Sequence, residues 1–445
     1  MSLQNGIYYN ESSAPPGNFG IVFLDVKKGT TASSLGASIN ELWKMCQNLE
    51  KGITNDFSPG SLIRRYTGEL SVLIGYGSKI FSIQNIRKRC PADFSGEYLF
   101  RRPTKEGDPI IEGSGLKFTN VENTDDCYFD EIMIQFTSMT SFTTNRAILE
   151  TCKMLQSSEN NNSNFSLQIR KFYTGFNQPD QRNWLGFYDG ISNMKSDERI
   201  HAIAINGNSL SQDDSWLMNG TYMAFLRIGI DLGIWSSIDQ KTQEIIIGRD
   251  KLTGCPLVGI DEAGNPVKDP RCPVRGTLDI TDSGNEGFRE HGEFGQQTNL
   301  PSGVSDKGLV DSHIGRTHRA VGVPAWNSES SRIFRQSFEF LDPIDGPPRY
   351  VAGLNFVCFL NTPKRLFSML RNWMGAANFG GDPDRSVPEM QQFLKIYGAG
   401  IFTIPPINKD EPFPGASLFP ELELVSNNET SVNGIQNSQS THYPQ

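Results

Sequence analysis

The order of strand and helix patterns in the first 176 residues constrains the fold of this chain more than any other feature. Alternating or β-branched segments predict strands, and apolar residues spaced three or four apart predict helices. The predicted strands are residues 21–26, 70–77, 131–138 and 166–176, and the predicted helices are residues 33–52 and 143–158. The resulting order, β-α-β-β-α-β, is that of a ferredoxin-like unit.

The second half of the chain repeats this order more loosely. Strands are predicted at 221–231, 331–340, 351–360 and 399–406, and helices at 234–247 and 363–374. A loop-rich insertion at 249–330 separates the first helix from the next strand. We therefore predict an α+β fold of two tandem ferredoxin-like domains with antiparallel sheets, at 17–185 and 186–420. The polar residues 421–445 are predicted to be a disordered tail.

Charge and cysteine content narrow the class of protein. The chain has 41 Lys and Arg against 50 Asp and Glu, a formal charge of −9. A protein that binds nucleic acid needs a basic surface, so no nucleic-acid partner is expected. No signal peptide or membrane-spanning run is visible, which predicts a cytoplasmic protein with no membrane partner. The seven cysteines include no Cys-x-x-Cys pair, so zinc sites of the usual spacing, covalent haem attachment and a disulfide framework are not expected.

Histidine is scarce, and one of the five stands in a suggestive segment. His313 lies in LVDSHIGRTHRA, where Arg316 and Arg319 follow closely. A single imidazole is too few ligands for a zinc or non-haem iron site. It is enough for haem, because the porphyrin supplies four ligands, and nearby arginines can pair with the propionates. The alternative is that His313 is an ordinary loop residue.

A single acid between two glycines raises a second question. Asp189 lies in GFYDGISN, between Gly186 and Gly190. An Asp-Gly turn alone explains this pattern, because glycine accepts a positive φ. A catalytic interpretation needs partners elsewhere in the chain. The glycine-rich segments GYGSKI and GRDKLTG match no nucleotide-binding motif, and no nucleophile elbow is present.

Several segments together resemble the dye-decolorizing peroxidase family. In chain order they are NFGIVFLDV, LSVLIGYG, WLGFYDGISN, TYMAFLRIGIDLGIW, EIIIGRDKLTGCPL, DSHIGRTHRA, RIFRQSFEF, GLNFVCF, WMGAANFGGDPD and AGIFTIPP. The resemblance extends over roughly residues 17–406 in one order. It implies two ferredoxin-like domains, with one haem b per chain bound non-covalently and mainly by the second domain.

The resemblance also implies roles for individual residues. His313 matches the axial ligand of the haem iron, Asp189 the distal acid–base residue and Arg335 its distal partner. Leu354 and Phe356 match the apolar distal wall. The further haem contacts that it implies are Phe187, Ile191, Asn193, Arg316 and Arg319.

Two more residues are assigned on the same resemblance. Asp382, in GGDPD, is the candidate to accept a hydrogen bond from the other nitrogen of His313. Trp373 is the candidate to relay electrons from a bulky donor, and the alternative is a tryptophan packed in the core. The chain also departs from the family pattern. Gly315 stands where an arginine is usual, and Phe340 stands where some members have a tyrosine.

The predicted function is that of a haem b peroxidase, which reduces hydrogen peroxide and oxidises dyes, phenols or other organic donors. A carboxylate such as Asp189 can move a proton between the two peroxide oxygens. A guanidinium such as Arg335 can stabilise the departing hydroxide. The first alternative is a haem-binding or haem-handling protein with little turnover, which would have no use for this pair. The second is a structural α+β protein without haem.

Overall fold

The structure is a computed structural model that places most of the chain. The residues it describes are 2–10, 15–54, 56, 64–94, 98–100, 127–160, 165–178, 182–188, 196–207, 212–269, 302–305, 309, 312–314, 332–374 and 393–420.

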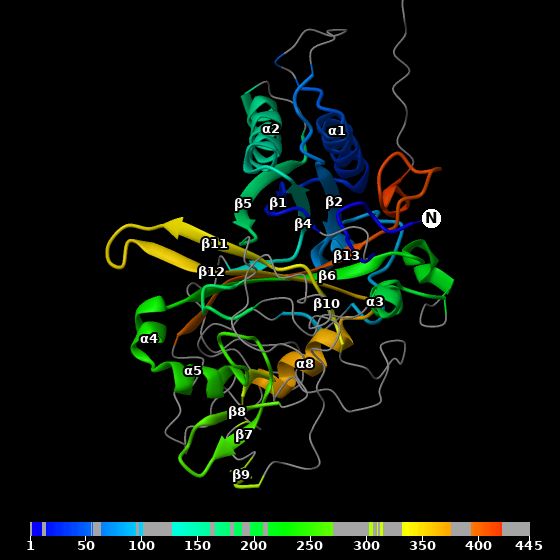
Figure 1. Ribbon diagram of the computed structural model, residues 1–445. Coiled ribbons are helices and arrows are strands. Elements are labelled where there is room, and N and C mark those ends of the chain that lie inside the picture. The colour runs from blue at the N-terminus through cyan, green and yellow to red at the C-terminus, as the bar shows by residue number, and fades with distance from the viewer. Residues whose placement is uncertain are drawn as a thin grey trace, which may run out of the picture.

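The N-terminal half has the predicted ferredoxin-like order. Its elements are β1 (Asn18–Val26), α1 (Ala32–Glu50), β2 (Ser71–Tyr76), β4 (Ile132–Ser138), α2 (Ser141–Asn160) and β5 (Leu167–Phe176). The four strands are antiparallel and lie in the order β5-β1-β4-β2. Both helices lie on one side of this sheet, at the top of Figure 1. The prediction for this half is confirmed.

Helix α1 shows how local sequence produces this arrangement. Thr31 caps its N-terminus by accepting a hydrogen bond from the backbone N–H of Ser34, and the Ser34 side chain accepts one from Thr31 in return. The apolar face that the spacing predicts is buried, and it consists of Ile39, Leu42, Trp43, Cys46 and Leu49. Leu35 is buried on the same helix. This spacing places one stripe of the helix against the sheet.

The C-terminal half repeats the topology. Its elements are β6 (Thr221–Ile230), α4 (Leu232–Ser237), α5 (Gln240–Ile247), β11 (Phe338–Pro343), β12 (Tyr350–Leu360), α8 (Lys364–Met374) and β13 (Leu394–Ile404). The antiparallel strand order is β11-β12-β6-β13, which is the order of the first half. Helices α4, α5 and α8 lie below this sheet in Figure 1. The second ferredoxin-like unit is therefore also confirmed.

The structure differs from the prediction in several details. The helix predicted at 234–247 is broken in two, because Asp231 caps α4 and Asp239 caps α5. The strand predicted at 331–340 is assigned as β10 (Phe334–Arg335) and β11, which pair with β12 in one register. The remaining elements are η1 (Ser78–Ser82), β3 (Tyr128–Phe129), α3 (Ser196–Ile203), η3 (Gln212–Leu217), β7 (Leu257–Asp261), β8 (Pro266–Lys268), β9 (Val304–Ser305) and η5 (Ala416–Leu418). Strands β7, β8 and β9 form a small sheet inside the predicted loop-rich insertion.

The two half-sheets join into a closed ring of strands. Strand β11 meets β5 at Glu339 and Phe176, and β13 meets β2 at Thr403 and Tyr76. Within the second half, β6 joins β12 to β13, so the series of paired strands returns to its start and the ring is closed. The interior is filled by one hydrophobic cluster from both halves, in which Phe23 stacks on Phe129 with ring centroids 3.8 Å apart. The outer sides of both half-sheets pack against the helices.

Cysteine chemistry corrects one expectation. Cys255 is disulfide-bonded, whereas Cys46, Cys90, Cys127, Cys152 and Cys358 are free. One disulfide-bonded cysteine is not a disulfide framework, but it removes the support that the cysteines gave to a reducing compartment. In the part of the chain that the structure describes, no helix has both the length and the apolar character needed to cross a bilayer.

Candidate functional site

The outer face of the second half-sheet supplies an apolar wall. Alternate residues of β6 and β12 point to this face, and Leu226 lies opposite Phe356 in the ladder, with Ile228 opposite Leu354. Phe356 is buried and Leu354 is half-buried, and both belong to the hydrophobic cluster that includes Leu366 of α8. The two residues predicted for the distal wall therefore share one face of the sheet.

Arg335 lies on the neighbouring strand of the same face. Strand β10 places it directly opposite Cys358, two residues beyond Phe356 on β12. Directly opposed side chains in an antiparallel pair point to the same side. Burial raises the pKa of the Cys358 thiol, and the positive charge of Arg335 opposes this effect, so the two groups are close. Arg335 thus adds a cation at the edge of the apolar wall.

The end of α5 fixes the segment that carries His313. Gly248 terminates α5 in the left-handed region, with φ of 85°. A Cβ atom at this position would lie 2.6 Å from Ser312 Oγ and 3.3 Å from Ile314 Cβ. The helix end and residues 312–314 are therefore in direct contact. His313 is half-buried, and its Nδ1 atom is shielded from solvent.

Arg249 lies near both the segment that carries His313 and Arg335. It follows Gly248 directly, is only 7% exposed, and donates a hydrogen bond of 2.9 Å from Nη1 to the Gly254 carbonyl. Burial and, to a smaller extent, the nearby charge of Arg335 together lower the pKa of Arg249 to about 9. Sequence analysis did not select Arg249. The sequence feature that could have indicated Arg249 is an arginine directly after the glycine at which a helix ends.

The turn that leads into GFYDGISN is fixed from two sides. The Asn183 side chain accepts hydrogen bonds from the backbone N–H groups of Leu185 and Phe187, at 3.1 and 3.2 Å. Arg182 donates to the carbonyls of Gly186 and Lys251, both at 2.8 Å. Phe187 is fully packed in the core. Phe187, two residues before Asp189, is therefore held in place beside the α5–β7 connection.

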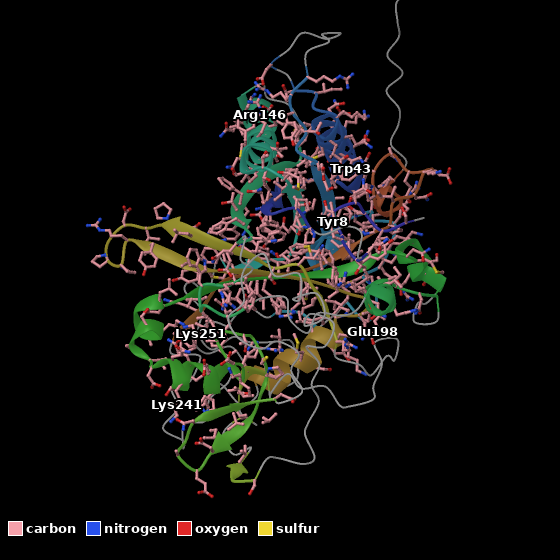
Figure 2. The ribbon with its side chains drawn as sticks, viewed as in Figure 1. Tyr8, Trp43, Arg146, Glu198, Lys241 and Lys251 are labelled. Carbon is pink, nitrogen blue, oxygen red and sulfur yellow. The ribbon has the colours of Figure 1, made fainter. Side chains whose placement is uncertain are left out.

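Lys251 contributes a second cation near this turn. A Cβ atom on Gly186, whose φ is 85°, would lie 2.6 Å from Lys251 Cε. The Lys251 ammonium lies 5.5 Å from the ring centroid of Phe187 and 5.7 Å from that of Trp235. Burial lowers the pKa of Lys251, and Glu244 opposes that effect. Figure 2 shows Lys251 near α4 and α5, below the second half-sheet.

The structure places only part of the predicted site. It brings His313, Arg335, Leu354, Phe356 and Phe187 to the side of the second half-sheet that faces α5 and α8. Trp373 lies in α8, but its side chain is outside the description. The other predicted residues that lie outside the described part of the chain are Asp189, Ile191, Asn193, Arg316, Arg319 and Asp382.

The chemistry of these groups fits haem. A porphyrin needs one axial imidazole, an apolar surface for its ring and cations for its two carboxylates. His313, the wall around Phe356 and the guanidinium group of Arg249 are of these three kinds. Within the described residues, no group of three or more His, Cys, Asp or Glu side chains could hold a metal ion.

Comparison with known families identifies the class of protein. A family model described as the C-terminal part of Dyp-type peroxidases matches residues 180–409, slightly more than half of the chain. The chain belongs to the Dyp-type peroxidase family.

Individual relatives are more distant. The chain is 23% identical over 239 residues to a deferrochelatase of Escherichia coli O157:H7, and 22% identical over 238 residues to one of Shigella boydii. These matches cover 53% of this chain and 45% of each relative, so the chain matches about half the length of these curated relatives.

Solved structures match over nearly the whole chain. A DyP-type peroxidase from Cellulomonas bogoriensis has a TM-score of 0.62 at 19% identity, and the match covers 91% of this chain and 93% of that one. Ferric DtpA from Streptomyces lividans has a TM-score of 0.62 at 20% identity, covering 93% and 94%. At this level of identity the likeness shows the fold.

Proposed function

We propose that this chain is a haem b peroxidase that uses hydrogen peroxide to oxidise dyes, phenols or other aromatic donors. Family membership supports this, and one observation carries it. Residues 312–314 lie against Gly248 at the end of α5, the next residue, Arg249, is near enough to Arg335 for their charges to interact, and Arg335 lies on the outer face of the second half-sheet. One candidate iron ligand and one candidate distal cation therefore lie on the same side of one half-sheet.

His313 is proposed to hold the iron of one non-covalently bound haem per chain. Since its Nδ1 atom is shielded by the protein, Nε2 is the nitrogen available for the iron. When bound, the haem supplies the redox chemistry of the reaction. Asp382 is proposed to accept a hydrogen bond from Nδ1, which would fix the ring orientation. Arg249 is proposed to join Arg316 and Arg319 as a partner of the propionates.

The distal side is proposed to consist of Asp189 and Arg335. The carboxylate takes the proton from the inner oxygen of hydrogen peroxide and delivers it to the outer oxygen. The guanidinium stabilises the negative charge that develops on the departing oxygen. Leu354, Phe356 and Phe187 exclude water from this reaction, because they present only apolar atoms.

Rapid mixing with hydrogen peroxide tests this proposal. The haem-loaded protein should show a fast spectral change, followed by oxidation of an added phenol or dye. Loss of a positioned acid–base group costs about 10²- to 10⁴-fold in rate, so Asp189→Asn or Arg335→Leu should slow the spectral change without removing the haem. A parental rate in both variants would exclude this distal pair.

A second candidate function is the handling of haem with little peroxide turnover. The observation that favours it is the name deferrochelatase carried by the curated relatives. Release of iron from haem would leave a metal-free porphyrin, which fluoresces, whereas peroxidase turnover would not. Incubation of the haem-loaded protein with a reductant, with and without peroxide and donor, distinguishes the two by fluorescence and donor oxidation.

A further inference from the structure

Helix α3 contacts the strand that carries the proposed distal arginine. It begins at Ser196, shortly after Asp189 in the chain, and it packs near β10, which carries Arg335. Figure 2 shows Glu198 on this helix, beside β10 and away from the N-terminal helices. The contacts that attach α3 to its surroundings are therefore candidates for setting the geometry of the distal side.

An ion pair attaches α3 to the start of β10. Glu198 Oε2 lies 2.6 Å from Arg332 Nη1, and the two side chains are only 18% and 6% exposed. Arg332 precedes Arg335 by three residues. Next to this pair, the guanidinium of Arg199 lies 5.2 Å from the ring centroid of Phe334. Two successive residues of α3 thus contact the segment that leads directly to Arg335.

A buried arginine of α8 ties the same network to the end of β12. Arg365 donates from Nε to Asn361 Oδ1 at 2.7 Å and from Nη1 to the Arg332 carbonyl at 3.4 Å. Asn361 in turn donates from its side chain to the His201 carbonyl at 3.0 Å, and from its backbone to the Ala202 carbonyl at 2.7 Å. Helix α3 is therefore held at its beginning by β10 and at its end by the β12–α8 connection.

The network depends on the Glu198 carboxylate, because it contains two buried guanidinium groups, those of Arg332 and Arg365. Burial and the nearby charge of Arg332 lower the pKa of Arg365 to about 10, so two guanidinium groups repel each other in a desolvated place. The carboxylate of Glu198 offsets this repulsion. Without the Glu198 carboxylate, the guanidinium groups of Arg332 and Arg365 would move apart to reduce their repulsion. Because Arg332 lies just before β10, its movement would displace the start of that strand.

We propose that Glu198 and Arg332 are positioning residues that set the location of Arg335 on the outer face of the second half-sheet. This rests on the proposed function, because it assigns Arg335 to the reaction with peroxide. A displacement of about 1 Å in a reacting group can cost up to about 100-fold in rate. Loss of the ion pair should therefore slow the peroxide step selectively.

The test compares Glu198→Gln with a matched control in the haem-loaded protein. The control is Glu150→Gln, which removes a carboxylate bonded to Arg146 at 2.8 Å, with side chains 4% and 16% exposed, on α2 far from the site (Figure 2). Glu198→Gln should lower kcat/KM for peroxide about 10- to 100-fold and leave kcat/KM for the donor unchanged. Glu198→Asp should recover part of the loss. Glu150→Gln should lower thermal stability only. An equal loss of both kinetic constants in Glu198→Gln would show a merely structural role and overturn the proposal.

Two further measurements separate this proposal from the function on which it rests. Backbone amide exchange of the peptide 332–336 should accelerate in Glu198→Gln with or without haem, and remain unchanged in Glu150→Gln. In an Arg335→Leu background, Glu198→Gln should have no additional effect on the peroxide rate. A full additional effect there would refute positioning through Arg335. Failure of Arg335→Leu itself to slow the peroxide step would instead refute the proposed role of Arg335.

Discussion

Replacement of Gly248 by alanine should weaken haem binding through the segment that carries His313. Gly248 has φ of 85°, which costs a residue with a Cβ atom about 1–2 kcal/mol. The new methyl group would also lie 2.6 Å from Ser312 Oγ and 3.3 Å from Ile314 Cβ. Residues 312–314 must therefore move away from α5. If this movement costs the bound state about 1.4 kcal/mol, the dissociation constant for haem rises about tenfold.

Gly264→Ala is the matched control for this prediction. Gly264 lies between β7 and β8 with φ of 78°, and its added Cβ would meet only the end of the Lys241 side chain, at 3.5 Å. It therefore shares the backbone cost without disturbing residues 312–314. Thermal unfolding of the haem-free proteins should show comparable destabilisation. Titration with haem should show weaker binding in Gly248→Ala alone. Equal haem affinity in the two variants would refute the inference that α5 positions His313.

Three other predictions concern a carboxylate, a tryptophan and the cysteines. Burial raises the pKa of Glu50 to about 7, from 4.5, so the folded protein loses stability as pH rises through this range. Glu50→Gln should match the parent below pH 4.5 and be more stable by up to about 3 kcal/mol well above pH 7, as measured by chemical unfolding; an advantage that is the same at every pH would contradict this. Trp373→Phe should abolish turnover of large dyes while small phenols are still oxidised, whereas lower stability with a uniform loss would indicate a core tryptophan. Alkylation of the denatured protein without reductant should modify Cys46, Cys90, Cys127, Cys152 and Cys358 and spare Cys255, and complete labelling of Cys255 would exclude its disulfide.

Local periodicity was sufficient to predict the fold. The stripe from Ile39 to Leu49 predicted both the helix and the face that it buries, because a helix on a sheet must be apolar on one side. Periodicity could not show the break between α4 and α5. Apolar residues continue across it, and only the caps Asp231 and Asp239 indicate two starts. Helix α3, SDERIHAI, was missed because it is short and mostly polar.

The sequence predicted a site residue only where that residue lies in a segment that resembles the family. His313 and Arg335 stand in segments that resemble the family, so they could be selected from the sequence alone. Arg249 could not, because its importance lies in its burial beside Arg335. The pair Glu198–Arg332 depends on the packing of α3 against β10, which joins residues far apart in the sequence. Contacts of this kind follow from the tertiary structure and leave no local pattern.

The absorption spectrum of the haem-loaded protein tests the central claim most directly. His313→Ala should lose the parental Soret band or bind much less haem, because His313 is the proposed axial ligand. His318→Ala, which removes the other histidine of the same sequence segment, should retain the parental spectrum and haem content. Full haem occupancy with an unchanged Soret band in His313→Ala would contradict the account.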